Sequence, residues 1–210
     1  LLVTLLAGAP VPAQAAWVWS PQTGWIGPSG APKDTPEAQL DYALSFFEQG
    51  DYDKATIEFK KLLKHYRESR EAADAQYYLG RTREAERDYY KAFLEYRKTV
   101  QVYPSTARFN EVLERMAQIG NYFLAGNKRK LMGGAALLPA RDKAVEVFQA
   151  IVEDGPFSPQ GELAQYKLGL AHLALGEYEQ AVTAFEQVIE RYPNSPLFGA
   201  RGSVRSLMHG

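Results

Sequence analysis

Residues 50–55 read GDYDKA, and the same pattern returns as RDYYKA at residues 87–92 and as GEYEQA at residues 176–181. A shortened copy, RDKA, occupies residues 141–144. The alanines that close the four copies are separated by 37, 52 and 37 residues. A recurring period of this size indicates a stack of similar structural units, each too small to bury its apolar face alone.

Further positions follow the same register. An aromatic residue lies four positions after each alanine, at Phe59, Tyr96, Phe148 and Phe185. A proline lies twelve positions after each of the last three alanines. Small residues lie twelve positions before the first, second and fourth alanines, and for the third repeat the pattern predicts Ala117, with its extra residues placed after it. A small residue facing a ring allows two helices to pack closely.

The repeat therefore predicts an all-α solenoid of paired helices, with about four and a half repeats. Gly50 and Gly176 are expected to end the first helix of their pairs in the left-handed conformation, which glycine adopts readily. Proline is expected to stop the second helix, because it lacks a backbone donor. The predicted pairs are 36–49 with 52–66, 71–86 with 89–103, 107–124 with 140–154, and 159–175 with 177–192.

The chain divides into three parts. Residues 1–16 are apolar and end near the small residues of Ala13-Gln14-Ala15, which is typical of a signal peptide. Residues 17–35 form a linker rich in Pro, Gly and Trp. The array is expected over 36–210. Its repeats fall near 36–69, 73–106, 107–156 and 162–195, and a partial repeat at 196–210 suggests that the sequence is cut within a fifth unit.

The linker holds all three tryptophans, Trp17, Trp19 and Trp25. Tryptophans clustered outside helices can anchor at a membrane interface or dock on a partner. They can equally pack against the first helix, which is the common fate of large rings. Packing against the helix is the favoured interpretation.

The long interval of 52 residues is explained by an insertion at residues 125–139, which lacks helical periodicity and is expected to form a loop. The insertion contains the only basic triplet of the sequence, Lys128, Arg129 and Lys130. The triplet is either a contact loop for an acidic partner or anionic membrane surface, or a solvated loop whose cations favour the negative end of the preceding helix. Both interpretations stay open.

Composition narrows the function. The 24 basic and 25 acidic residues leave a net charge of -1, so the chain has no basic field for nucleic acid. It contains no cysteine and only three widely spaced histidines. Catalytic, metal and cofactor-binding residues are therefore predicted to be absent, and the protein is not expected to be an enzyme. No transmembrane helix is expected in the mature chain, because the apolar run at residues 1–9 is too short.

This pattern of a small residue, a glycine, an alanine, an aromatic residue and a closing proline resembles the tetratricopeptide repeat. The sequence also has Tyr-Pro pairs at 103–104 and 192–193 and the signal-peptide-like segment before the repeats. Together these features resemble more narrowly the BamD-like outer-membrane assembly factors. That resemblance implies a periplasmic scaffold, without cofactors, that holds the barrel-forming assembly protein and receives unfolded barrel precursors. The family is normally lipidated on cysteine, whereas Ala9 occupies that place here. Peripheral attachment to the outer membrane would then depend on partners or on the linker.

In such a superhelix the first helix of each pair lines the inner groove. The register places Arg81 beside aromatic residues, and this set would suit the carboxylate and terminal ring of a barrel precursor. The competing interpretation is stronger, because aromatic residues at helical spacing usually belong to the core and a lone arginine usually pairs with a nearby glutamate. The candidate groove residues are Leu44, Phe47, Tyr77, Arg81, Glu84, Tyr166 and Leu170.

Two other functions were weighed against the assembly scaffold. A periplasmic coordinator of cell division or of peptidoglycan and envelope maintenance would share the repeats. Such proteins usually carry a coiled coil before the repeats, which the Pro and Gly of residues 17–33 exclude here. A hydrolase would need two carboxylates at a fixed separation across a cleft, and no such pair is evident in the sequence.

Overall fold

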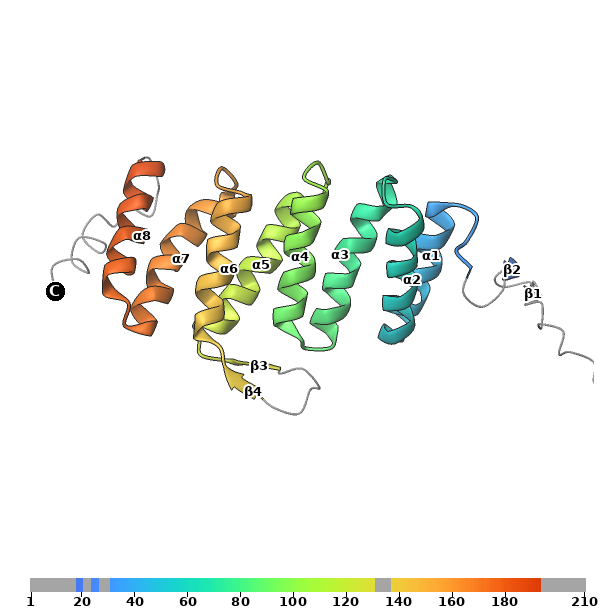
Figure 1. Ribbon diagram of the computed structural model, residues 1–210, viewed down its shortest axis with the longest axis horizontal. Coiled ribbons are helices and arrows are strands. Elements are labelled where there is room, and N and C mark those ends of the chain that lie inside the picture. The colour runs from blue at the N-terminus through green and yellow to red at the C-terminus, as the bar shows by residue number, and fades with distance from the viewer. Residues whose placement is uncertain (1–17, 21–23, 27–30, 131–136, 194–210) are drawn as a thin grey trace, which may run out of the picture.

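The computed structural model describes residues 18–20, 24–26, 31–130 and 137–193, and these contain eight helices (Figure 1). The predicted all-α repeat fold is confirmed, and the helix ends fall within about two residues of those predicted. The helices are α1 (Pro36–Glu48), α2 (Tyr52–His65), α3 (Arg70–Ala85), α4 (Tyr89–Val102), α5 (Phe109–Leu124), α6 (Arg141–Asp154), α7 (Pro159–Leu175) and α8 (Tyr178–Arg191).

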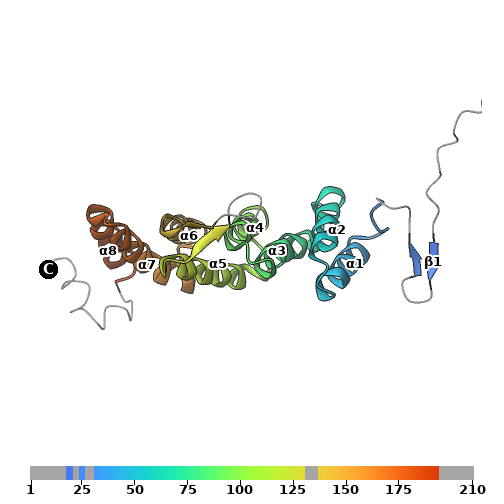
Figure 2. The same ribbon diagram turned by 90° about the horizontal axis from the view of Figure 1, so that it is seen from below.

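The helices form an elongated stack of antiparallel pairs, with α1 and α8 at opposite ends (Figure 1). The odd-numbered helices make one layer and the even-numbered helices the other (Figure 2). We call the outer surface of α1, α3, α5 and α7 the A face, and the outer surface of α2, α4, α6 and α8 the B face. Gly50 and Gly176 have φ angles of 77° and 79°, which confirms that both adopt the left-handed conformation between paired helices.

Packing within each pair follows the predicted register. The alanines at 55, 92, 144 and 181 are all fully buried, because the paired helices meet there. A Cβ atom added to Gly80 would lie 2.4 Å from the Tyr96 ring, and one added to Gly169 would lie 2.4 Å from the Phe185 ring. The ring of the second helix therefore fills the space that the missing side chain of the first helix leaves.

The third repeat uses a different residue from the one predicted. A Cβ on Gly120 would lie 2.7 Å from the Phe148 ring, so Gly120 matches Gly80 and Gly169, and Ala117 does not. Gly80 and Gly120 are 40 residues apart, against 37 for Ala43 and Gly80. Three of the extra residues therefore precede this contact, in the turn between α4 and α5, and the remaining twelve follow it.

The segment predicted to be a loop at 125–139 contains a β-hairpin instead. Strand β3 (Lys128–Lys130) pairs antiparallel with β4 (Leu137–Pro139), and Arg129 lies opposite Leu138. Two adjacent glycines between short apolar runs are a hairpin signal that the search for helical periodicity missed. In the linker, β1 (Val18–Ser20) pairs with β2 (Gly24–Ile26), so that Trp19 lies opposite Trp25.

Three predictions lie outside the described part of the chain. They are the signal peptide at 1–16, the partial repeat at 196–210, and the packing of the tryptophan rings, since Trp17 and the side chains of both short strands in the linker are not described.

Tyrosines at the ends of the second helices join successive repeats. The Tyr103 hydroxyl donates to the Arg67 carbonyl at 3.3 Å, and the Tyr192 hydroxyl donates to the Pro156 carbonyl at 2.6 Å. Both bonds link residues 36 positions apart. Tyr66 makes the corresponding bond to the Lys33 carbonyl, which fixes the segment before α1. The tyrosine of each Tyr-Pro pair is therefore a structural link between repeats.

A buried glutamine joins the two helices of three repeats. The amides of Gln39, Gln76 and Gln165 each donate to a backbone carbonyl 19 residues later, at 3.1–3.2 Å. The third repeat has the apolar and fully buried Met116 at the same register position. The Gln39 oxygen accepts the Lys33 amide, whereas the fully buried Gln165 oxygen has no partner. The reason is local, because Pro159 stands where Lys33 stands in the first repeat and has no N–H to donate.

This difference predicts unequal responses to the same substitution at the two glutamines. Gln39→Met should lower the free energy of unfolding by about 1–3 kcal/mol, because it removes three hydrogen bonds of a buried amide. Gln165→Met should change stability by less than about 1 kcal/mol, because it also removes an unpaired buried oxygen. Urea unfolding of both variants measures the difference, and equal losses would contradict the assignment.

Candidate protein-binding surface

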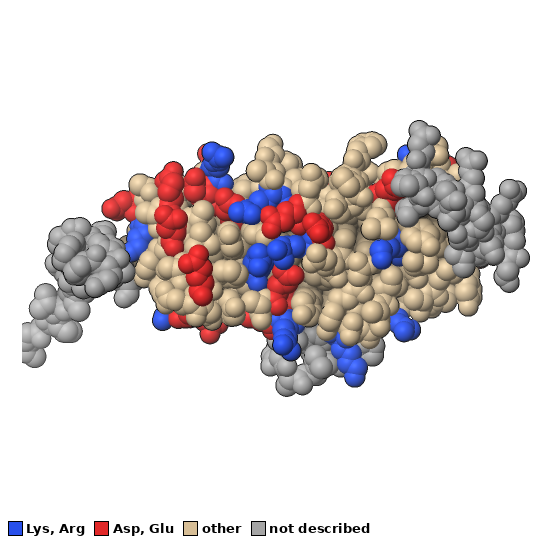
Figure 3. Space-filling model, turned by 180° about the vertical axis from the view of Figure 1, so that it is seen from behind, with Lys and Arg blue, Asp and Glu red and all other residues tan. Residues whose placement is uncertain are grey.

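Side chains of α3 and α5 form a cluster of charged and phenolic groups in the middle of the array. We call it the A-face cluster. Figure 3 shows positive and negative side chains gathered midway along this side of the molecule. Within the cluster the three arginines are matched by three carboxylates. Its members are Asp74, Tyr77, Arg81 and Glu84 from α3, and Arg108, Glu111 and Arg115 at the start of and within α5.

Tyr77 is the centre of this cluster. Its hydroxyl donates to Glu111 and accepts from Arg81 Nη1 and Arg115 Nε, both at 3.1 Å. The Arg108 guanidinium lies 4.7 Å from the centre of the Tyr77 ring, within the range of a cation–π contact. One hydroxyl therefore connects both helices, and the carboxylate of Glu111 fixes the direction of its proton.

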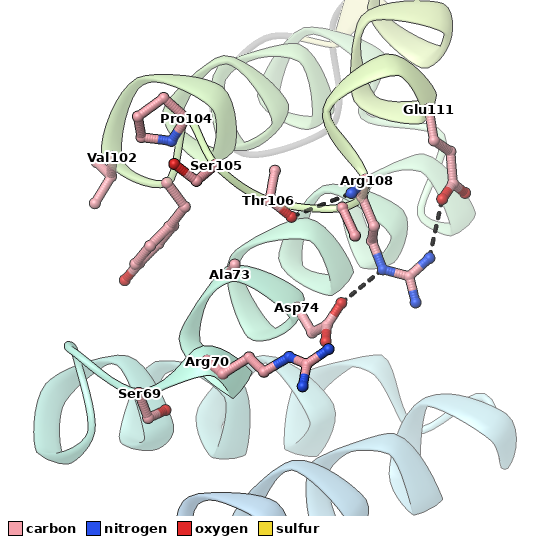
Figure 4. Close-up of a pocket in the computed structure, with 12 residues that line it drawn as sticks. Ser69, Arg70, Ala73, Asp74, Val102, Pro104, Ser105, Thr106, Arg108 and Glu111 are labelled. Atoms are coloured by element: carbon pink, nitrogen blue, oxygen red, sulfur yellow. Dashed lines mark hydrogen bonds and ion pairs between the residues drawn. The ribbon is translucent and has the colours of Figure 1, made fainter.

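Arg108 closes the cluster at the turn that precedes α5. Its Nε donates to Asp74 at 2.6 Å and its Nη1 donates to Glu111 at 2.9 Å, so that it bridges the two helices (Figure 4). A surface hollow of about 690 Å³ lies beside it, between the start of α3 and the α4–α5 turn. The exposed Arg70 lines this hollow, and its side chain forms no hydrogen bond or ion pair with another described residue.

The other end of the cluster is built around Glu84. Its Oε2 accepts from Arg115 Nη1 at 3.1 Å and from the Tyr96 hydroxyl at 2.5 Å. Arg81 Nε lies 3.6 Å from the same oxygen. Arg81 is therefore the least tightly paired of the three arginines, since its one hydrogen bond within the described part of the chain is to Tyr77. Its side chain keeps a third of its surface exposed, so its remaining donors are open to a partner.

Arg115 explains why the cluster lies here. The residue equivalent to Arg115 is the buried Ala75 in the second repeat and the buried Ala164 in the fourth. The backbones of α1 and α3 lie close together, and so do the backbones of α5 and α7. The backbones of α3 and α5 are farther apart. A long arginine in place of alanine, together with three extra residues in the turn, therefore opens a gap that polar side chains fill.

Burial and pairing shift the pKa values of these groups. Burial alone would raise the pKa of Glu111, but the hydrogen bond from Tyr77 and the Arg108 guanidinium outweigh it and hold the pKa below its usual 4.5. Burial and the Glu111 hydrogen bond raise the pKa of Tyr77. Burial and the Glu84 hydrogen bond likewise raise that of Tyr96. At neutral pH the carboxylate of Glu111 is therefore charged while both phenols are protonated, which suits binding and not proton transfer.

The depressed pKa of Glu111 predicts a pH dependence. The pKa of Glu111 is lower in the folded chain than in the unfolded chain. As the pH falls through about 4.5, the unfolded chain therefore binds more protons than the folded chain. The Glu111 contribution to stability is lost as the pH falls further, through the folded pKa. Glu111→Gln should be less stable than the wild type at pH 7, and the gap should narrow in acid. Urea unfolding at pH 7, 4 and 3 measures this. A gap that stays constant would contradict it.

The predicted groove residues do not all lie together. Tyr77 is only 1% exposed, so its ring belongs to the core, as the stronger of the two interpretations of the sequence has it, and it offers no stacking face to a partner. Phe47 contacts Tyr78 at 5.5 Å between ring centres, and it does not pair with Tyr77. Leu44 and Phe47 are half-buried against the core of the first two repeats.

Two further groups of predicted residues lie elsewhere. Tyr166 and Leu170 are half-buried on α7 against Phe185, away from the cluster. Lys128 is exposed at the start of β3, while the side chains of Arg129 and Lys130 are outside the described set. Of the predicted groove, only Tyr77, Arg81 and Glu84 are brought together, and the expected pairing of Arg81 with Glu84 is present.

Sequence reasoning missed the half of the cluster that α5 supplies. Arg108, Glu111 and Arg115 are absent from the predicted groove, because that groove was drawn from positions three before and one or four after the small residue of each repeat. Alignment on Gly120 sets Arg115 against an alanine in each of the other three repeats. A charged residue at a position that other repeats keep small is the signal that would have found it.

No group of three or more His, Asp or Glu side chains among the described residues is placed to hold a metal ion. Among the helices that the structure describes, none is long and apolar enough to cross a bilayer.

The fold and this surface define a helical-repeat scaffold for protein–protein interaction. More particularly, the chain forms a tetratricopeptide-repeat superhelix, since the family model of that repeat matches residues 37–69, 74–106 and 163–195. The unmatched stretch contains the third repeat, with its hairpin insertion and shifted register. Tetratricopeptide repeats generally serve as non-catalytic scaffolds, and nothing in the described residues points to an enzyme.

Two solved structures illustrate the chains to which this one is similar, both at low sequence identity. MamA from Desulfovibrio magneticus RS-1, from residue 41 to its end, is 16% identical, with a TM-score of 0.42, and the match covers 85% of this chain and 92% of that one. The C-terminal part of a tetratricopeptide-repeat protein from Cytophaga hutchinsonii is 18% identical, with a TM-score of 0.45 and coverage of 84% and 61%. A sequence comparison with curated proteins gives no match.

Proposed function

We propose that the A-face cluster binds an acidic group of a partner protein, and that Arg81 makes the main contact. The observation that carries this proposal is the incomplete pairing of Arg81, which has one hydrogen bond and one carboxylate at 3.6 Å. A planar guanidinium with free donors suits a bidentate carboxylate contact. Arg108 and Arg115 are already bound to carboxylates and hold the surrounding groups in place.

The partner that we propose is the outer-membrane barrel assembly machinery, in the periplasm. Support for it comes from the sequence: a leader-like segment at residues 1–16, and repeats closed by Tyr-Pro in the manner of the BamD-like factors. The carboxylate would belong to the barrel-forming assembly protein or to an unfolded barrel precursor. Attachment at the membrane would then be peripheral and carried by these partners.

Affinity capture from envelope extracts tests the proposal. The wild-type chain should recover a barrel-forming assembly protein, and Arg81→Leu should recover about tenfold less, which corresponds to ~1.4 kcal/mol of binding energy. Arg97→Leu is the matched control, because Arg97 forms its ion pairs on the B face with Glu153 and Asp154. Equal capture by both variants would exclude Arg81. Recovery of only division or peptidoglycan-associated proteins would replace the assembly role with the envelope-coordinator role.

A further inference from the structure

The B face has a groove between α6 and α8 that the proposed function does not use. Two surface hollows of about 630 Å³ and 370 Å³ share Gln149 on α6 and Gln187 on α8, so they run end to end between these helices. Leu168 and His172 of α7 form part of the lining. The hollows extend along α8 from Glu179 to Arg191, or ~18 Å at the rise of an α-helix.

A long side chain closes the corresponding gap between α4 and α6, and the groove lies where such a link is missing. On α4, Arg97 reaches α6 and donates to Glu153 at 2.7 Å and to Asp154 at 3.1 Å, so the backbones of α4 and α6 are drawn together. The register places Gln149 at the same position on α6. Its shorter side chain donates to Glu153 of its own helix at 3.0 Å, and no interaction recorded between described residues joins Gln149 to α8.

An aromatic side chain marks one end of the groove. Phe157, in the turn between α6 and α7, is 98% exposed and lines the larger hollow together with Val152 and Tyr192. The register positions that correspond to Phe157 hold the polar residues Glu68 and Ser105. A phenylalanine with nothing covering it, at a turn that is otherwise polar, has the character of an anchor for a binding partner.

The rest of the lining identifies the chemistry of the partner. The polar side chains of the lining, Gln149, Gln180, Gln187 and Thr183, can donate to and accept from a peptide main chain. Three of them already make one hydrogen bond each, and they keep a further amide hydrogen, an amide oxygen or a hydroxyl lone pair for a partner. The charged side chains of the two hollows, Glu153, Glu179 and Arg191, leave an excess of one negative charge, so the groove disfavours an acidic segment. A length of ~18 Å holds about five residues of extended chain.

We propose that this groove binds an extended, uncharged polypeptide segment through its main chain, with an apolar or aromatic side chain packed against Phe157. The site lies on the face opposite the A-face cluster. It can therefore be present or absent whether or not the outer-membrane assembly role is correct.

A synthetic peptide tests the proposal. The probe is a ten-residue peptide with capped ends that alternates Phe or Val with Ser or Thr, titrated into the full chain by calorimetry. We expect Phe157→Ser to weaken binding about tenfold or more, with an unchanged melting temperature, because serine is found at the equivalent Ser105. Gln149→Arg should also weaken binding, because the register would place its longer side chain between Glu190 and Arg191 of α8, where it would occupy the groove.

Controls separate the groove from other surfaces. Ile57→Ser removes another exposed apolar side chain, on α2, and should leave binding unchanged. Arg81→Leu should also bind the peptide normally, so a failure of the A-face proposal does not affect this one. A peptide with alternate N-methylated residues should bind poorly, since it lacks main-chain donors. Wild-type affinity in both Phe157→Ser and Gln149→Arg, or equal binding of the methylated peptide, would overturn the proposal.

Discussion

Phe148→Ala is expected to lower the free energy of unfolding by about 3–5 kcal/mol. The Phe148 ring is fully buried in the largest core cluster, where α5, α6 and α7 meet. It also fills the space left by Gly120, and the wall opposite the lost ring is therefore backbone that cannot move in to close the cavity. A loss of this size is a large fraction of the stability of an ordinary domain.

Urea unfolding followed by circular dichroism measures this effect, and the chain supplies its own control. Phe157→Ala removes the same side chain from a site that is almost fully exposed, and it should change stability by less than about 0.5 kcal/mol. Similar losses in both variants would show that the Phe148 ring does not organise the third repeat.

The fold could be predicted because the contacts within a helix pair leave a mark in the sequence. A small residue, an alanine and a ring must occur at fixed spacing, since two close-packed helices have no room for alternatives. Ala55, Ala92, Ala144 and Ala181 were found in this way, and all are buried at the helix–helix contacts. The ends of the first helices at Gly50 and Gly176 could be predicted because glycine readily adopts the left-handed conformation found there.

Contacts between repeats could not be predicted in the same way, because the residues that make them do not recur at a fixed spacing in the sequence. Whether α3 and α5 approach closely depends on a three-residue lengthening of a turn and on Arg115 in place of alanine. Whether α4 and α6 are joined depends on Arg97, a side chain that reaches across to a different repeat. A long charged side chain can reach several oppositely charged residues, and only the structure shows with which of them it forms an ion pair.

The two candidate sites illustrate this difference. Both lie where one repeat departs from its neighbours: the A-face cluster at Arg115, and the B-face groove at Gln149 and Phe157. A residue that obeys the repeat is explained by packing. A residue that differs from its equivalents in the other repeats, and whose difference is not explained by packing in its own helix pair, is a better indicator of a binding site than a residue that matches them. This holds only where the repeats are aligned correctly.

The register itself is tested by Gly120→Val, which should lower the free energy of unfolding by about 3 kcal/mol. Its first added atom would lie 2.7 Å from the buried Phe148 ring, and neither can move freely. Ala117→Val adds less bulk at a half-buried site and should lower stability by less than about 1 kcal/mol. In the Phe148→Ala background, Gly120→Val should instead be neutral or stabilising, because the valine enters the vacated space. Additive losses in this double variant, or a larger loss at Ala117, would return the third repeat to the alignment on Ala117.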